Sequence, residues 1–240
     1  AGDLVANDST ATWAAHLARR LGAEVSTVGF GRLAWTIDGN GNVPAFHRSW
    51  THKWAGEPRR FQSGEGGCAD GDAASGRPLR APVVVVNLGT NDGLLANEAA
   101  PPEEMCHIVE RWLGSARTAL GPEAHIFLCV PFGGFGGASM PPLNVLPRAM
   151  ESYQAACRPG GDPRTHLIDL GAAASTHLTG FRFTKEGRFD ATEESADGIH
   201  PTVGRHAQLG EMLYERVAAK LLATEEEEEE ESVSEGGVVW

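Results

Sequence analysis

The chain has 240 residues, of which 41% are hydrophobic, and this is enough to build one sizeable buried core. Its formal net charge of −12 argues against nucleic acid, or an anionic membrane surface, as the main partner. No apolar run approaches the roughly 20 residues that a membrane-spanning helix needs, so we expect no membrane span.

The first predicted elements are a helix and a short strand. Residues 10–21 carry apolar side chains at helical spacing, with Ser9 and Thr10 as candidate N-caps and Gly22 as a stop. Residues 23–30 then alternate in the manner that is typical of a strand.

Strands and helices alternate through the rest of the chain. The strands are continuous apolar runs, and such strands alternating with helices favour a parallel sheet that is covered on both faces. In sheets of this kind, functional sites lie just beyond the carboxyl ends of the strands. The predicted strands cover residues 83–87, 124–131 and 166–170, and the predicted helices cover residues 102–120, 146–157 and 201–222.

The C-terminal segment differs from the rest of the chain in its charge. Residues 225–231 are an unbroken run of glutamates, and like charges at adjacent positions repel one another. Nothing nearby offers an apolar face for packing. We therefore predict one domain over residues 1–223, followed by a disordered acidic tail over residues 224–240.

Small polar residues follow the strand predicted over residues 83–87. One interpretation is a plain stop between strand and loop. The other is that the strand holds reactive groups at the edge of the sheet. The side-chain amide of Asn91 and a backbone N–H from the glycine turn at Gly31 are suited to stabilising the negatively charged oxygen that forms during ester hydrolysis. We expect Asp92 to stabilise the loop through hydrogen bonds to the backbone.

Asp197 and His200 stand three residues apart, just before the last predicted helix. A carboxylate in this position can accept the Nδ1–H of the imidazole and leave Nε2 free to act as a base. The alternative is that Asp197 caps the helix and His200 is an ordinary surface residue.

Together these segments resemble the SGNH (GDSL-type) hydrolase family over about residues 13–222. Gly89-Thr90-Asn91-Asp92 matches the family's Gly-x-Asn-Asp block, and Asp197-Gly198-Ile199-His200 matches its Asp-x-x-His block. For the family's single-glycine block, the chain offers Gly31 and, less closely, Gly29.

This resemblance implies a fold and an activity. The fold is a three-layer α/β/α arrangement with a mainly parallel sheet, flavodoxin-like, and the activity is ester hydrolysis by a nucleophilic serine. The resemblance assigns Asn91 and Gly31 to the oxyanion hole and His200 to the role of base, with Asp197 orienting it. We expect no cofactor.

The family's Gly-Asp-Ser block has no clear match. Gly2-Asp3 is followed by Leu4, and Ser9 stands four residues before Trp13, where it suits a helix N-cap. We therefore predict that the first strand and its serine lie upstream of Ala1, and that this chain alone is incomplete and inactive. Ser9 is the alternative nucleophile.

The long irregular stretch over residues 38–81 and its tryptophans give an indication of the substrate class. This stretch makes the chain resemble the carbohydrate esterases that deacetylate sugars. Trp35, Trp50 and Trp54 can form an aromatic platform for a sugar ring, or they can be pegs that pin the loop to the sheet. We expect a carbohydrate ester or another small ester as the substrate. The alternatives are hydrolysis of a lipid acyl ester and a carbohydrate-binding remnant without activity.

His47 and His52 flank Trp50, but neither a carboxylate nor a cysteine stands close enough in sequence to complete a set of ligands. We therefore predict no metal site.

Overall fold

The computed structural model describes residues 9–25, 27, 31–41, 43–49, 83–131, 141–157, 159–170, 182–183, 189–190 and 200–235. The chain divides into two compact units. The first, here called the sheet unit, comprises Gly29–Phe132 and Ala138–Asp169. The second, the helix-pair unit, comprises Ala1–Val28, Gly133–Gly137 and Leu170–Trp240. The single domain predicted over residues 1–223 thus contains parts of both units, and its integrity stays a prediction.

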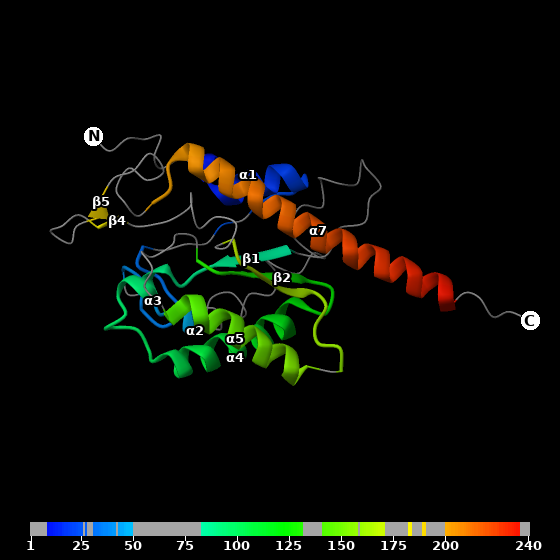
Figure 1. Cartoon of the computed structure of the whole chain (residues 1–240), viewed down its shortest axis with the longest axis horizontal. Coiled ribbons are helices and arrows are strands. Elements are labelled where there is room, and N and C mark those ends of the chain that lie inside the picture. The colour runs from blue at the N-terminus through cyan, green and yellow to red at the C-terminus, as the bar shows by residue number, and fades with distance from the viewer. Residues whose placement is uncertain are drawn as a thin grey trace, which may run out of the picture. The chain divides into compact units, whose positions relative to one another are not determined.

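The sheet unit is built on three parallel strands in the order β1-β2-β3 (Figure 1). The strands are β1 (Val83–Asn87), β2 (His125–Cys129) and β3 (Thr165–Ile168). They lie within a few residues of the predicted strands, and their parallel pairing confirms the predicted sheet type. Residue 87 is opposite residue 129, and residue 129 is opposite residue 168, so the carboxyl ends of the strands lie together.

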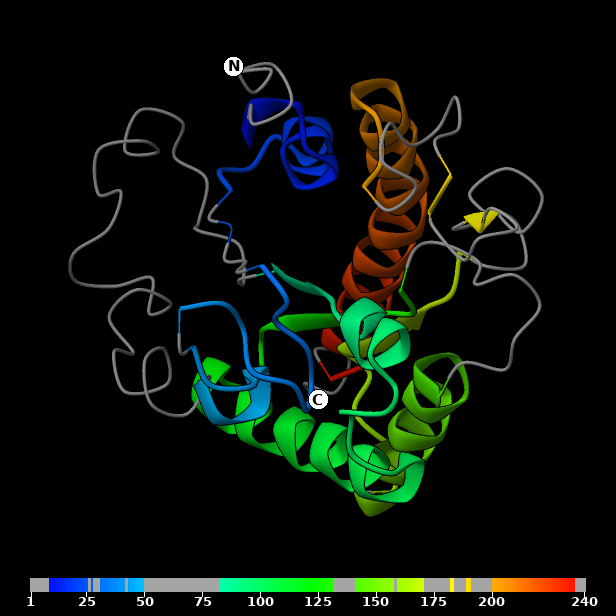
Figure 2. The same cartoon turned by 90° about the vertical axis from the view of Figure 1, so that its left-hand side faces the viewer.

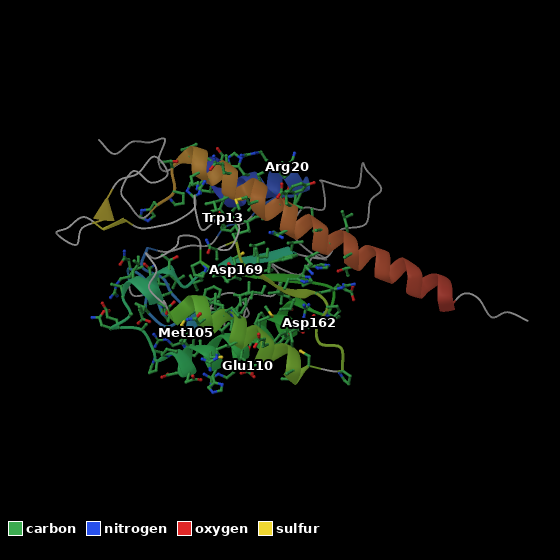
Figure 3. All side chains as sticks on the ribbon, in the orientation of Figure 1. Trp13, Arg20, Met105, Glu110, Asp162 and Asp169 are labelled. Carbon is green, nitrogen blue, oxygen red and sulfur yellow. The ribbon has the colours of Figure 1, made fainter. Side chains whose placement is uncertain are left out.

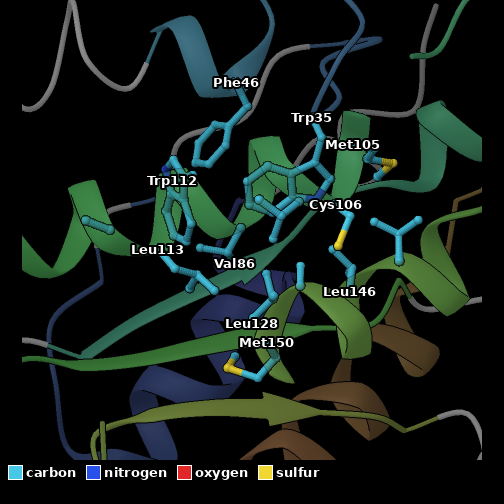
Figure 4. Packing of buried hydrophobic residues seen from close by; sticks show 14 of the residues in the cluster. Trp35, Phe46, Val86, Met105, Cys106, Trp112, Leu113, Leu128, Leu146 and Met150 are labelled. Atoms are coloured by element: carbon cyan, nitrogen blue, oxygen red, sulfur yellow. The ribbon is translucent and has the colours of Figure 1, made fainter. Parts of the chain in front are cut away.

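Two long helices, α4 (Pro102–Leu120) and α5 (Pro141–Ala156), pack against each other and against one face of the sheet (Figure 1). The apolar face predicted for α4 is buried: Met105, Val109 and Leu113 have no exposed surface. Helix α5 begins earlier than the predicted residue 146, because Pro141 and Pro142 stand in its first turn, where a missing N–H costs nothing. Figure 4 shows the resulting core.

Strand β1 is less buried than its valine run predicted. Val86 is buried, but Val83 is 38% exposed and Val84 and Val85 are half-buried. The reason is its place in the sheet: of the described strands, only β2 pairs with β1, whereas β2 lies between two strands and is buried throughout.

Among the described residues, the helix-pair unit consists mainly of α1 (Trp13–Leu21) and α7 (Val203–Glu235), which lie side by side (Figures 1 and 2). Gly210 permits the close approach, since a Cβ atom there would lie 2.4 Å from the Cβ of His16. Arg20 of α1 forms an ion pair of 2.9 Å with Glu211 of α7 (Arg20 is labelled in Figure 3). A short antiparallel pair, β4 (Arg182–Phe183) and β5 (Phe189–Asp190), belongs to the same unit.

The ends of both helices correct the sequence predictions. Ser9 and Thr10 lie in a short 3-10 helix, η2 (Ser9–Ala11), and the N-cap of α1 is Thr12, whose hydroxyl accepts the Ala15 N–H at 3.3 Å. Gly22 ends α1 as predicted, with a left-handed φ of 64°.

Helix α7 continues to Glu235, where a disordered tail was predicted from residue 224. Glutamate is a good helix former, so the acidic run extends the helix in spite of its like charges. Residues 236–240 lie outside the described part of the chain.

The strand predicted over residues 23–30 is not formed at the described positions 23–25 and 27, which have no regular structure. Val25 is 49% exposed. A strand requires a hydrogen-bonded neighbour, and alternation of side chains alone does not provide one.

Candidate active site

Asn91 and Asp92 lie in a short helix, α3 (Thr90–Leu94), directly after the carboxyl end of β1. The sequence predicted a loop here. Gly89 makes the turn from strand to helix with a φ of 120°, a backbone conformation that favours glycine. This explains why the glycine of the Gly-x-Asn-Asp block is needed, and it places both polar side chains at the edge of the sheet.

The side-chain amide of Asn91 contacts the segment that contains Gly31. Asn91 Nδ2 donates a hydrogen bond of 3.1 Å to the carbonyl oxygen of Leu33, two residues after Gly31. An amide nitrogen carries two hydrogens, so this bond leaves a second one for another acceptor. The structure therefore brings the two segments that carry the predicted oxyanion donors together in one unit.

Asp92 holds the same segment from another side. Its carboxylate has no exposed surface and accepts hydrogen bonds from the backbone N–H of Trp35 at 2.8 Å, the backbone N–H of Thr36 at 2.9 Å and the Thr36 hydroxyl at 2.7 Å. The predicted hydrogen bonds of Asp92 to the backbone are thus confirmed. Burial raises the pKa of Asp92, and these three hydrogen bonds oppose that shift without cancelling it.

Trp35 corrects one site prediction. It has no exposed surface, and its ring packs edge-on against Phe46 and Trp112, with centroids 5.3 Å away in each case (Figure 4). Its indole N–H donates to the Leu88 carbonyl at 3.2 Å. A ring with no free face cannot stack on a sugar, so Trp35 is a peg that fixes the loop to the core. Trp50 and Trp54 lie outside the described residues.

The remainder of the loop, up to α2 (Phe46–Ser49), closes on itself. Gly31 accepts the Asn40 N–H at 2.8 Å through its carbonyl oxygen, and residues 39 and 43 form a bridge. Helix α2 then packs against α4 (Figure 2). Arg32, next to Gly31, has a φ of 65° and forms an ion pair with Glu98. A left-handed conformation at a residue other than glycine is strained, and such strain gathers at functional sites.

His200 belongs to the helix-pair unit, where it is exposed and stands three residues before α7. The helix begins two residues later than predicted, and the Thr202 hydroxyl accepts the Arg205 N–H at 3.3 Å. Asp197 lies outside the described residues. Because Asn91 and His200 belong to different units, their convergence on one pocket stays a prediction.

His206 is a feature that sequence reasoning missed. Its Nδ1 accepts the backbone N–H of Trp13 at 3.3 Å, so this imidazole satisfies a free donor at the start of α1. Burial lowers the pKa of His206, and the nearby His16 and His200 lower it further. The signal was a histidine in the first turn of α7, but its partner is 193 residues away in sequence.

The described residues also bear on two other kinds of site. No three His, Cys, Asp or Glu side chains among them come together as a metal ion would require. None of the described helices is both long enough and apolar enough to cross a membrane.

The family is decided by comparison with known sequences. The model of the GDSL-like lipase/acylhydrolase family matches residues 1–207. The chain belongs to this family. The resemblance read from the Gly-x-Asn-Asp and Asp-x-x-His blocks is thereby confirmed. A search of curated proteins found no match.

Solved structures show the same fold as this member of the GDSL-like family. A family two carbohydrate esterase from Clostridium thermocellum, in complex with cellohexaose, is 20% identical with a TM-score of 0.55, and the match covers 89% of this chain and 55% of that one. A carbohydrate esterase family 2 enzyme plus carbohydrate-binding domain from Corynascus thermopiles (Myceliophthora fergusii) is also 20% identical, with a TM-score of 0.54 and coverage of 89% and 57%.

A putative arylesterase from Agrobacterium tumefaciens is 16% identical with a TM-score of 0.51, and the match covers 88% of this chain and 87% of that one. This chain therefore spans little more than half the length of the two carbohydrate esterases. At these identities the likeness is one of fold. With the family match, it confirms the predicted α/β/α class of the SGNH hydrolases.

Proposed function

We propose that this chain belongs to an SGNH-type esterase, in which Asn91 and Gly31 supply the oxyanion hole and His200 is the base. The observation that carries the proposal is the hydrogen bond from Asn91 Nδ2 to the Leu33 carbonyl. It ties the Gly-x-Asn-Asp block to the glycine segment and leaves one amide hydrogen of Asn91 for the substrate.

The roles follow from the chemistry of acyl transfer. His200 Nε2 takes the proton of a serine hydroxyl, and the serine oxygen attacks the ester carbonyl. The Asn91 amide and the Gly31 N–H donate to the oxygen that becomes negative. His200 then protonates the leaving alcohol, and water releases the acid by the same steps in reverse order. Asp197 orients the imidazole.

The serine is supplied, in this proposal, by a Gly-Asp-Ser segment outside residues 1–240. No Gly-Asp-Ser triplet occurs in the sequence. Ser9 stands in η2, close to the N-cap of α1, which is consistent with a local structural role. The chain of residues 1–240 is accordingly expected to be inactive by itself.

The substrate class we propose is a carbohydrate ester, with acetyl as the acyl group. Two proteins that share the fold are described as carbohydrate esterases, and one of them was solved with cellohexaose. Trp50 and Trp54 are the remaining candidates for a sugar platform in this chain, since aromatic faces suit the apolar side of a pyranose.

The test compares two proteins on 4-nitrophenyl acetate and on acetylated xylo-oligosaccharides. One is residues 1–240, and the other carries an added N-terminal strand that ends in Gly-Asp-Ser. We expect hydrolysis only in the second. Removal of the Asn91 amide in that form (Asn91→Ala) should lower kcat on the order of 100-fold, the usual cost of one oxyanion donor.

Several results would count against the proposal. Full activity of residues 1–240 that is abolished by Ser9→Ala would make Ser9 the nucleophile. Faster hydrolysis of octanoyl than of acetyl esters would favour the lipid alternative. Xylo-oligosaccharide binding that survives His200→Ala, without turnover in any form, would indicate a binding remnant.

A further inference from the structure

We propose that Asp92 and the hydroxyl of Thr36 are positioning groups for the oxyanion hole, which fix the Asn91 amide and the Gly31 segment relative to each other. This inference rests on the function proposed above for the same site. Neither group is expected to touch the substrate, because Asp92 has no exposed surface and its described hydrogen bonds all go to Trp35 and Thr36.

The first step of the argument concerns the two neighbouring side chains on α3. Adjacent residues of a helix point in directions about 100° apart. Nevertheless, Asn91 and Asp92 both reach the short segment over residues 33–36: Asn91 donates to its carbonyl at Leu33, and Asp92 accepts its amide N–H groups. The segment is therefore held to α3 by two neighbouring side chains, one that donates and one that accepts. Loss of either contact lets it rotate.

The second step concerns the Thr36 hydroxyl, which has one hydrogen to donate. That hydrogen goes to Asp92 Oδ1 at 2.7 Å, and the hydroxyl oxygen accepts the backbone N–H of Ala100 at 3.1 Å. Ala100 stands two residues before α4, whose inner face is part of the core. The hydroxyl thus connects three segments: the loop, α3 and the start of α4.

The third step concerns distance along the chain. Gly31 is two residues from Leu33, and a residue spans at most about 3.6 Å, so a shift of the segment over residues 33–36 is passed on to the Gly31 N–H. Two donors that must converge on one oxygen tolerate little movement. A misplacement of about 1 Å can lower a rate on the order of 100-fold.

Thr36→Val and Thr36→Ser provide the sharpest test. Valine has nearly the same shape as threonine but lacks the hydroxyl, whereas serine keeps it. In the enzyme that carries the added Gly-Asp-Ser strand, we expect Thr36→Val to lower kcat on the order of 10- to 100-fold with KM little changed, as for an interaction made in the transition state. Thr36→Ser should restore kcat to within about threefold of the unsubstituted enzyme.

Thr118→Val is the matched control. The Thr118 hydroxyl also donates one hydrogen bond, of 2.9 Å to the Gly114 carbonyl, but it is exposed on α4. We expect it to leave kcat unchanged. An equal loss of kcat in Thr118→Val and Thr36→Val, or no rescue by serine, would overturn the positioning role.

A second readout needs no catalysis and uses residues 1–240 as they stand. The side-chain amide resonances of Asn91 in a ¹H–¹⁵N spectrum should move in Thr36→Val and in Asp92→Asn, and stay in place in Thr36→Ser and Thr118→Val. If the strand-bearing enzyme proves inactive on every ester, the proposed function fails, and these resonances still decide the positioning role. Unmoved Asn91 resonances in both Thr36→Val and Asp92→Asn would overturn it.

Discussion

Two aspartates, the buried Asp92 and the half-buried Asp162, stand at opposite ends of the same sheet and are held in opposite ways. Asp92 follows the carboxyl end of β1, in α3, and Asp162 precedes the amino end of β3 (Figures 1 and 3). Among the described residues, the donors to Asp92 are two backbone N–H groups and one hydroxyl, all uncharged. Asp162 instead accepts from the Arg117 guanidinium at 2.8 Å, with further bonds from Tyr153 and Thr165.

The pKa values of the two carboxyl groups diverge accordingly. Burial raises the pKa of both, but at Asp162 the hydrogen bonds from Thr165, Tyr153 and Arg117, together with the Arg117 charge, outweigh burial and leave the pKa below its usual range. At Asp92 burial prevails and the pKa is raised. An ionised Asp162 therefore stabilises the fold, whereas ionisation of Asp92 costs stability.

This difference distinguishes Asp162, which belongs to a structural network, from Asp92, for which we propose a positioning role. Arg117 joins Asp162 to the carbonyls of Gly121 and Ala124, at 2.8 and 2.7 Å, and so fastens the end of α4 to the sheet. None of the described residues supplies Asp92 with such a charge to offset its burial. A group that costs stability yet stands beside Asn91 is what a functional site is expected to contain.

The largest effect is expected from Asp162→Asn. The change leaves the Arg117 guanidinium, which is only 18% exposed, without its counter-charge. We expect the free energy of unfolding to fall by about 3 kcal/mol, measured by urea denaturation. Glu103→Gln is the control, since it breaks an ion pair with Arg148 that is exposed, and it should have no measurable effect. Equal effects of the two changes would contradict the network role.

Asp92→Asn should cost less, about 1–2 kcal/mol, because the new NH₂ group faces one of the donors of Trp35 or Thr36. Its pH dependence distinguishes the two aspartates. The folded pKa of Asp92 is raised, so its contribution is present below the unfolded pKa of about 3.9 and is lost as pH rises through the folded value.

The cost of Asp92→Asn should therefore shrink with rising pH. The folded pKa of Asp162 is lowered, so its contribution is present above the unfolded value and is lost as pH falls through the folded one. The cost of Asp162→Asn should accordingly grow as pH rises toward 4 and then level off, roughly at the unfolded pKa. Denaturation of both variants between about pH 3 and 7 measures the two trends, and trends of the same sign would refute the comparison.

Tyr153→Phe sharpens the comparison by removing one hydroxyl from the Asp162 end. It deletes the 2.7 Å bond to Asp162 Oδ2 and should cost about 1 kcal/mol of unfolding free energy. Acid unfolding should begin at higher pH, because one of the bonds that lower the pKa of Asp162 is gone. In the enzyme that carries the added Gly-Asp-Ser strand, Tyr153→Phe should leave kcat unchanged. A loss of kcat as large as that expected for Thr36→Val would show that the two ends are not functionally distinct.

Local patterns predicted the elements of the sheet unit well. The valine run predicted a strand over residues 83–87, which is the range of β1 in the structure. The apolar face of α4 is buried, as its helical spacing indicated. The Gly-x-Asn-Asp block singles out Asn91 as a candidate because its residues are adjacent in sequence, and its role as an oxyanion donor stays a prediction. What could not be predicted depends on partners far apart: Arg117 and Asp162 are separated by 45 residues, and Asp92 and Trp35 by 57.

Trp35 shows why composition alone misled. An aromatic ring in a loop can stack on a sugar or fill a core, and the choice depends on Phe46 and Trp112, which come from other elements (Figure 4). The length of α7 was missed for a different reason. Like charges at adjacent positions repel one another, but the high helix propensity of glutamate carries α7 through the acidic run to Glu235.

The smallest effect is expected at Arg32, at the Asp92 end of the sheet. The backbone of Arg32 has a left-handed conformation, which residues other than glycine disfavour. Near Asp162, the residues with positive φ are glycines, at positions 121, 160 and 161, and Arg32 is the one described residue of another type with positive φ. Arg32→Ala and Arg32→Gly both remove the ion pair with Glu98, but only glycine relieves the left-handed strain. We therefore expect the glycine variant to be the more stable by about 1 kcal/mol in urea denaturation.

The exposed helical position Arg111 is the control. There the order should reverse, and the alanine variant should be the more stable by about 1 kcal/mol. If alanine is the more stable at both positions, the Gly31 segment is not strained and the contrast between the two ends rests on the aspartates alone.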